Sequence, residues 1–194
     1  TTIRFALQHK QRKLFPIPWT MTVWLKSLKT SSRRAVKTSN ALLRSTMKAF
    51  KRFLVSNMQM NLLGSHDTIR ILTALSGEDP SEKNNDYLFS KKLSESEYNN
   101  GKRLLISAYT ILATLPGIPS IYYADEVGMQ GYSDPFNRLS FPWGKEDDDI
   151  LSPYKKIGKL RRENTVYKKG EFKLIHLCRN LLVFSRVDKD SEFI

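Results

Sequence analysis

The sequence predicts an α/β fold that continues into an antiparallel β module, and three observations support this prediction. Short apolar runs alternate with helical patterns between residues 58 and 166, the order of elements in a parallel α/β sheet. The hydrophobic period changes to that of strands after Gly170. The apolar runs at 58–63 and 118–123 both end in loops of acids, aromatics and glycines, and an α/β barrel places its chemistry at that end of a strand. This order predicts the tail of an α/β barrel, although periodicity alone does not separate a barrel from a doubly wound sheet.

The first strand and helix are predicted from a short apolar run and the turn that follows it. A buried strand is expected at residues 58–63, with Gly64-Ser65 as the turn beyond it. A short amphipathic helix is expected over residues 68–75. Arg70 is expected to lie on the exposed surface of this helix. Residues 78–93 are rich in Asn, Asp and Ser, which predicts a polar loop.

A longer helix and a second strand follow. Ser94 and Glu97 form a capping box, and apolar residues continue from it at helical spacing until Pro116-Gly117. The next strand is predicted at residues 118–123, only a few residues later, as βα units require. A long loop at residues 124–145 completes this unit.

The last part of the chain is predicted to form a helix and then antiparallel strands. Ser152-Pro153 has the N-cap and N1 chemistry of a helix start. Strands are expected at residues 172–177 and 181–187, around a turn at Cys178-Arg179-Asn180. A third strand is expected to begin where the sequence reaches Ile194, which predicts a β domain that is cut off.

Charge divides the chain into two parts. Residues 1–66 contain thirteen Lys or Arg and no Asp or Glu, whereas residues 67–194 contain nineteen of each sign. At an ordinary acid frequency of about one residue in eight, an acid-free stretch of this length is improbable. We therefore predict three segments: a basic segment of unclear structure at 1–57, the last part of a barrel at 58–166, and the truncated start of a β domain at 167–194.

Composition also argues against several classes of protein. The single Cys178 excludes an intramolecular disulfide framework and a cysteine metal tetrad. Residues 104–124 carry no charge over a length that spans a bilayer on paper, but Pro116, Gly117 and Pro119 interrupt them. A buried helix that leads into a buried strand is therefore favoured over a membrane span. No N-terminal apolar segment argues for secretion, and a cytoplasmic location is favoured.

Two motifs carry a resemblance to a known family. The first is Asn61-Leu62-Leu63-Gly64-Ser65-His66-Asp67-Thr68. The second is Pro116-Gly117-Ile118-Pro119-Ser120-Ile121-Tyr122-Tyr123-Ala124-Asp125-Glu126-Val127-Gly128, followed by Asp134-Pro135-Phe136-Asn137-Arg138 and Phe141-Pro142-Trp143-Gly144. The strands at residues 61–67 and 117–128 are similar to the last two barrel strands of the α-amylase superfamily (glycoside hydrolase family 13), and the longer match through Gly144 is similar to its neopullulanase, cyclomaltodextrinase and maltogenic amylase branch. The resemblance covers about residues 58–187, with the start of the family's C-terminal β domain after Gly170. The resemblance implies the C-terminal portion of a TIM (β/α)8 barrel, followed by the start of an antiparallel β domain.

The resemblance implies roles for four residues. In that family two carboxylates, a nucleophile and an acid/base, flank an oxocarbenium-like transition state in a retaining mechanism. Asp67 matches a third acid, which stabilises the transition state through the sugar hydroxyls, and His66 matches its sugar-binding neighbour. Asp134 and Arg138 resemble loop residues that bind glucose units beyond the cleavage point. From the residues alone, the alternatives are a helix-capping turn at Ser65-His66-Asp67 and a salt-bridged surface loop at Asp134 and Arg138.

The resemblance also implies a substrate class and indicates what this chain lacks. The implied ligands are α-glucans such as maltooligosaccharides or cyclodextrins, and a homo-oligomer remains open for the intact enzyme. The nucleophile and the acid/base belong on two earlier strands that this chain does not contain, so the isolated chain is expected to be inactive. No cofactor is implied. Calcium sites in such enzymes lie in other regions, and the run Asp147-Asp148-Asp149 has no metal-ligand spacing. The family has Gly where this chain has Ala124, which crowds the turn there.

Residues 1–57 show no barrel pattern, and two explanations compete. A frameshifted reading of the coding sequence is favoured, because the match begins abruptly at Met58. A genuine basic arm that binds nucleic acid or another anionic surface is the alternative. No reader motif accompanies the positive charges, so nucleic acid is not the favoured partner. A third hypothesis is a carbohydrate-binding remnant that carries no catalytic chemistry.

Overall fold

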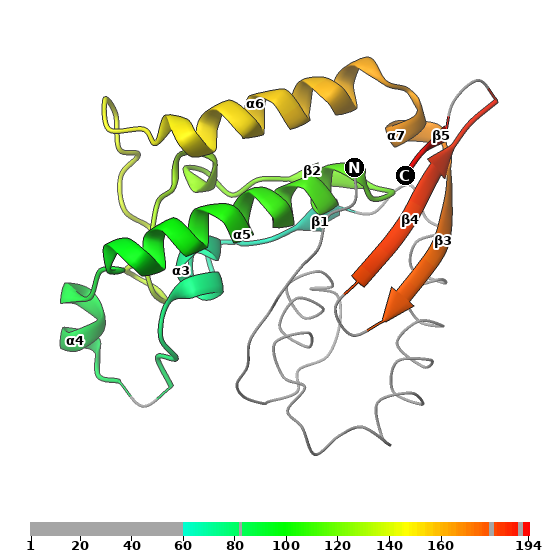
Figure 1. The fold of residues 1–194 in the computed structure, drawn as a ribbon. Coiled ribbons are helices and arrows are strands. Elements are labelled where there is room, and N and C mark those ends of the chain that lie inside the picture. The colour runs from blue at the N-terminus through cyan, green and yellow to red at the C-terminus, as the bar shows by residue number, and fades with distance from the viewer. Residues whose placement is uncertain (1–59, 82, 179–180, 190–191) are drawn as a thin grey trace, which may run out of the picture. The chain divides into compact units, whose positions relative to one another are not determined.

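The computed structural model describes residues 60–81, 83–178, 181–189 and 192–194, which form two units (Figure 1). One unit comprises Leu62–Ala113 and Pro119–Arg162, and the other comprises Thr114–Ile118, Glu163–Ile194 and the described residues before Leu62. The predicted basic segment at 1–57 lies outside the described residues.

The two predicted strands of the α/β region both form, and β2 is shorter than expected. β1 (Met60–Leu62) and β2 (Ile118–Ser120) make a two-stranded sheet. β2 ends before Tyr123 because the backbone there turns. The carbonyl of Tyr122 accepts a hydrogen bond from the backbone N–H of Asp125 at 3.1 Å, and the carbonyl of Tyr123 accepts one from the side chain of Arg70. Both carbonyls are therefore paired with loop or side-chain donors and not with a neighbouring strand.

The first helix begins three residues later than predicted. α3 (Ile71–Ser76) has Arg70 as its N-cap residue and Gly77 as its C-cap residue. The start is delayed because Thr68 is held in a turn, where its backbone N–H donates to the carbonyl of Ser65 at 3.2 Å. The prediction that Arg70 lies on the helix surface is wrong, since only 1% of this residue is exposed.

Residues 78–93, which the sequence predicts to be a loop, contain a short helix. α4 (Asn85–Ser90) is capped by Asn84, whose side chain accepts a hydrogen bond from the backbone N–H of Tyr87 at 2.8 Å. Leu88 is its one buried residue. A six-residue helix with a single buried side chain has no apolar stripe, so hydrophobic periodicity does not indicate it.

The predicted capping box forms at the start of α5 (Glu95–Thr114). The backbone N–H of Ser94 donates to Glu97 Oε2 at 2.8 Å, and the backbone N–H of Glu97 donates back to Ser94 Oγ at 3.3 Å. Farther along, Gly101 is buried against α3, where a Cβ would lie 2.8 Å from Leu72 Cδ1. None of the described helices combines the length and the apolar character needed to cross a membrane.

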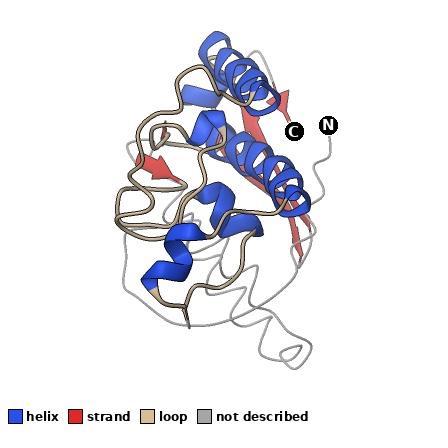
Figure 2. Cartoon of the chain, turned by 90° about the vertical axis from the view of Figure 1, so that its left-hand side faces the viewer, coloured by secondary structure: helices blue, strands red, loops and turns tan. Residues whose placement is uncertain are grey.

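α6 (Asp148–Glu163) packs beside α5 (Figure 1, Figure 2). The ring of Tyr109 on α5 stacks on that of Tyr154 on α6, with centroids 3.9 Å apart. α6 begins four residues before the predicted start at Ser152, because Asp147 caps it. The carbonyl of Asp147 accepts from the backbone N–H of Ile150 at 3.0 Å, and its Oδ1 accepts from that of Asp149 at 3.0 Å. Pro153 therefore lies inside the helix.

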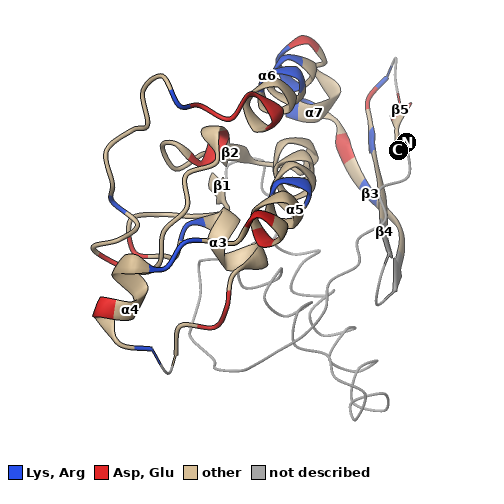
Figure 3. Cartoon of the chain, turned by 60° about the vertical axis from the view of Figure 1, so that its left-hand side comes forward, with Lys and Arg blue, Asp and Glu red and all other residues tan. Residues whose placement is uncertain are grey.

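Acidic residues occupy the first turns of both α5 and α6, as Figure 3 shows. Glu95 and Glu97 lie in the first turn of α5, and Asp148 and Asp149 lie in that of α6. Negative charge at a helix N-terminus is stabilised by the unpaired backbone N–H groups there.

The second unit contains α7 (Val166–Lys169) and three antiparallel strands, β3 (Glu171–Cys178), β4 (Leu181–Val187) and β5 (Glu192–Phe193). The sheet order is β3-β4-β5, with Glu171 opposite Val187 and Arg186 opposite Phe193. The two longer strands agree with the prediction. Arg186 is buried and donates to the carbonyls of Thr114 at 2.9 Å and Gly170 at 2.8 Å.

Candidate functional site

A tight turn after β1 exposes His66 and Asp67. Ser65 and Thr68 close the turn: the Ser65 N–H donates to Thr68 Oγ1 at 2.9 Å, and that hydroxyl donates back to the Ser65 carbonyl at 3.2 Å. Leu63 and Gly64, just before the turn, are buried, whereas His66 and Asp67 are exposed. The N-cap residue of α3 is Arg70, so the structure does not use Asp67 as the cap of that helix.

The structure brings all four predicted site residues into one chain of polar contacts. His66 Nε2 lies 3.1 Å from Asp67 Oδ1, and Arg138 Nη2 lies 3.9 Å from the same oxygen. Arg138 Nε in turn lies 2.9 Å from Asp134 Oδ1. The side chains of Asp67 and Asp134 are each 56% exposed, so these pairs contribute at most about 1 kcal/mol each to stability. The cluster is open to a ligand from solvent.

Asn137 joins the two loops that carry the cluster. Its side chain is fully buried, and Nδ2 donates to the carbonyls of His66 and Thr68, both at 2.7 Å. The same loop is packed against Gly131, where a Cβ would overlap the carbonyl of Phe136. A buried amide that donates to two backbone carbonyls fixes the register of the loops, because each carbonyl left unpaired would cost about 1–3 kcal/mol.

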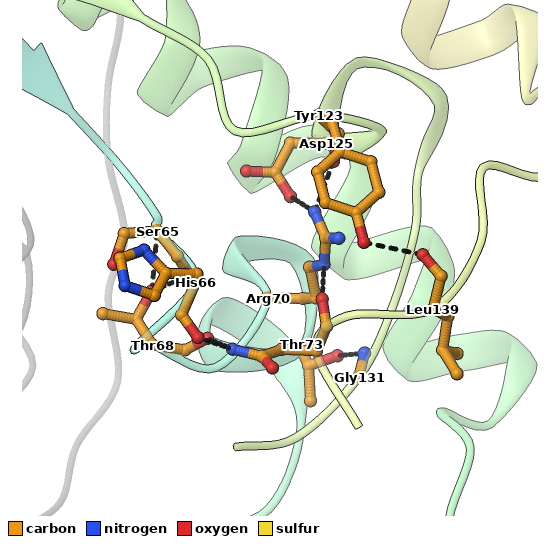
Figure 4. Close-up of polar contacts among 10 residues, drawn as sticks. Ser65, His66, Thr68, Arg70, Thr73, Tyr123, Asp125, Gly131 and Leu139 are labelled. Carbon is orange, nitrogen blue, oxygen red and sulfur yellow. Dashed lines mark hydrogen bonds and ion pairs between the residues drawn. The ribbon is translucent and has the colours of Figure 1, made fainter. Parts of the chain in front are cut away.

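Arg70 joins the loop after β1 to three residues of the segment after β2 (Figure 4). Its Nε donates to the carbonyl of Asn137 at 2.7 Å, and its Nη1 donates to the carbonyl of Tyr123 and to Asp125 Oδ1, the latter at 3.2 Å. The guanidinium also lies 4.2 Å from the ring centroid of Tyr122. Sequence reasoning missed this residue. The available signal was its place between Ile69 and the apolar pair Ile71-Leu72, which is an unusual setting for a solvated cation.

Asp125 is the buried partner of Arg70. Burial raises the pKa of the Asp125 carboxyl to about 7, and the positive charge of Arg70 opposes this rise. Its Oδ2 faces Gly64, where a Cβ would lie 3.3 Å away. Ala124, just before it, has a φ of 65°, a left-handed conformation that favours glycine.

A second polar group anchors the loop after β2 to the two long helices. Asp147 Oδ2 lies 2.9 Å from Lys102 Nζ and accepts a hydrogen bond from Tyr98 Oη at 2.9 Å. Its backbone N–H donates to the carbonyl of Val127 at 3.3 Å. Burial, and the bond to Asp147, raise the pKa of Tyr98 to about 12. Across the described residues, no three His, Cys, Asp or Glu side chains gather as a metal site would require.

Comparisons with known proteins identify similar sequences and structures. No family model matches the chain. An amylopullulanase of Thermoanaerobacter thermohydrosulfuricus is 42% identical over 127 residues, which are 66% of this chain and 8% of that protein. A cyclomaltodextrinase of Thermoanaerobacter pseudethanolicus is 34% identical over 142 residues, 72% of this chain and 21% of that protein. A solved cyclomaltodextrinase structure matches with a TM-score of 0.54 and 30% identity, over 69% of this chain and 20% of that one. The chain thus spans about a fifth or less of the length of these proteins.

Proposed function

Because this chain belongs to the α-amylase superfamily, in the branch of neopullulanases, cyclomaltodextrinases and maltogenic amylases, we propose that it forms part of an α-glucan-acting glycosidase. Residues 58–166 would be the last part of the (β/α)8 barrel, and residues 167–194 the start of the β domain. The succession of β1, α3, α5, β2 and α6 supports the first assignment. The antiparallel sheet β3-β4-β5 supports the second.

The observation that carries the proposed function is the joining of His66, Asp67, Asp134 and Arg138 into one exposed cluster. The cluster stands on the loops that follow the two strands of the α/β region, where a barrel binds its substrate. Charged side chains and an imidazole, half open to solvent, are suited to bind hydroxyl groups of a sugar. A helix cap or an isolated surface ion pair does not require two loops to be joined by a buried amide.

We assign Asp67 to the stabilisation of the transition state. A carboxylate that accepts hydrogen bonds from sugar hydroxyls strengthens those bonds as positive charge develops on the ring. His66, 3.1 Å away, donates to a neighbouring hydroxyl and holds the carboxylate in place. Asp134 and Arg138 bind glucose units beyond the point of cleavage.

The retaining reaction of the intact enzyme also needs a nucleophile and an acid/base. Residues 1–66 contain no Asp or Glu that could serve, and Asp125 is buried against Arg70. We therefore propose that the 194-residue chain binds glucan without hydrolysing it. Its substrates in the intact enzyme would be maltooligosaccharides or cyclodextrins, in keeping with the names of its relatives.

The test is a titration of the 194-residue chain with maltoheptaose and with β-cyclodextrin, followed by NMR. We expect weak binding that Asp67→Asn and His66→Ala both reduce. Asp149→Asn is the matched control, because it makes the same change at a carboxylate that is 82% exposed and paired with Lys102 instead. No binding by the unmodified chain would contradict the proposed site. Turnover of cyclodextrin, pullulan or starch that Asp67→Asn removes would contradict the proposed inactivity.

A further inference from the structure

α4 presents an exposed aromatic side chain beside the loop that carries Asp134 and Arg138. Phe89 on α4 is 74% exposed, although a phenylalanine of a globular protein is ordinarily buried. Its ring lies 5.7 Å, centroid to centroid, from that of Phe136, at an interplanar angle of 54°. Phe136 lies between Asp134 and Arg138 in sequence, so the same short loop carries this ring and two residues of the cluster.

α4 is joined to the segment before it by a group of polar contacts. Glu78 accepts a hydrogen bond from Tyr87 Oη at 2.6 Å and pairs with Lys91 at 3.4 Å and Lys83 at 3.5 Å. The hydrogen bond from Tyr87, with Lys91 and Lys83, lowers the pKa of Glu78. Leu88 packs inward from the next position of the helix. The side chain that precedes Phe89 therefore anchors α4 while Phe89 itself faces solvent.

We propose that Phe89 and Phe136 form an aromatic platform on which outer glucose rings of a bound α-glucan stack. This inference rests on the proposed function, because it places the platform beside the site of Asp134 and Arg138. A flat ring bordered by charged side chains offers an apolar face to the sugar ring and polar partners to its hydroxyls. The surface of two rings is far smaller than the roughly 800 Å² that each partner buries in a stable protein interface, which argues against a protein as the occupant.

The platform predicts a dependence on the length of the glucan. Short ligands such as maltose fill the charged cluster alone, whereas maltoheptaose reaches the rings as well. Phe89→Leu keeps an apolar side chain but removes the ring, and we expect it to weaken maltoheptaose binding about three- to tenfold, the range that ring stacking contributes. Binding of maltose should be unchanged. Phe89→Tyr keeps the ring and should bind maltoheptaose like the unmodified chain.

The experiment is an NMR titration of the 194-residue chain, Phe89→Leu, Phe89→Tyr and His66→Ala with maltose, maltotriose and maltoheptaose. His66→Ala should weaken the binding of all three ligands, whereas Phe89→Leu should weaken the binding of maltoheptaose alone. Equal affinity of Phe89→Leu and the unmodified chain for maltoheptaose would refute the platform and leave the proposed function standing. If Phe89→Leu weakens maltoheptaose binding while His66→Ala leaves the binding of all three ligands unchanged, the platform is supported and the proposed site is contradicted. A fall of several degrees in the Tm of Phe89→Leu would mean that another part of the chain covers the ring, and would overturn the inference.

Discussion

The pH dependence of stability is expected to report whether burial or the charge of Arg70 dominates the pKa of Asp125. The carboxyl of Asp125 is 3% exposed, with one oxygen 3.2 Å from Arg70 Nη1. Burial raises its pKa from the ordinary value of 3.8 to about 7, against the opposing charge of Arg70. Between these two pH values the folded chain binds a proton that the unfolded chain has released. The free energy of unfolding is therefore expected to fall as pH rises from about 4 to 7.

The size of this effect follows from the interval between the two pKa values of Asp125, which are 3.8 unfolded and about 7 folded. At about 1.4 kcal/mol for each pH unit, the loss of stability across the interval is on the order of 4 kcal/mol. Asp125→Asn removes the titrating group but keeps an oxygen that can accept from Arg70. The variant should lack this part of the pH dependence, so its stability relative to the unmodified chain should rise by about 4 kcal/mol as pH rises from about 4 to 8.

Urea unfolding followed by circular dichroism, at pH 5, 6, 7 and 8, measures the difference between the unmodified chain and Asp125→Asn. All other groups titrate in both proteins and cancel in the difference. Asp149→Asn serves as the control, because it makes the same change at a carboxylate that is 82% exposed. If the unmodified chain gains stability over Asp125→Asn as pH rises, the pKa of Asp125 is depressed by Arg70 and the reasoning is refuted.

Three further substitutions test the packing that supports the site. Arg70→Met should lower the free energy of unfolding by about 3–5 kcal/mol at pH 8, because it leaves the buried carboxylate of Asp125 unpaired. An unchanged urea midpoint would contradict a stabilising role of the Arg70 contacts. Gly101→Ala should destabilise by about 1–3 kcal/mol, since a Cβ there lies 2.8 Å from Leu72 Cδ1, whereas Gly158→Ala, 3.5 Å from its nearest neighbour, should stabilise by about 1 kcal/mol. If Gly101→Ala and Gly158→Ala shift the Tm in the same direction, this contrast is disproved. Ser94→Ala should cost about 1 kcal/mol and speed hydrogen exchange in the first turn of α5, and unaltered exchange would count against the capping box.

Local signals in the sequence were sufficient for elements whose ends are set by their own residues. The capping box of Ser94 and Glu97 predicted the start of α5, because both of its hydrogen bonds join residues three apart. The exposed turn of His66 and Asp67 was likewise readable as a motif. The start of α6 was misplaced because two capping signals competed, and Asp147 rather than Ser152 accepts the first backbone hydrogen bonds.

The role of Arg70 was not predictable from its neighbours in sequence alone. Its acceptors lie 53, 55 and 67 residues farther along the chain, at Tyr123, Asp125 and Asn137. A helical pattern assigns a cation to the exposed face by default, because a buried cation is stable only when distant groups pair with it. Helix α4 escaped prediction for a related reason, since Leu88 alone of its six residues packs inward.

Because Asn137 bonds the two loops of the site directly to each other, the geometry of the site does not depend on the length of chain between them. Its amide donates to His66 and Thr68, which precede it by 71 and 69 residues, and its carbonyl receives Arg70. The loop ends are thus locked directly to each other, and the chain between them does not set their separation. Insertions or deletions at its exposed positions leave the distance from Asp67 to Arg138 unaltered. A change of one residue between Asp134 and Asn137, by contrast, would shift the whole cluster.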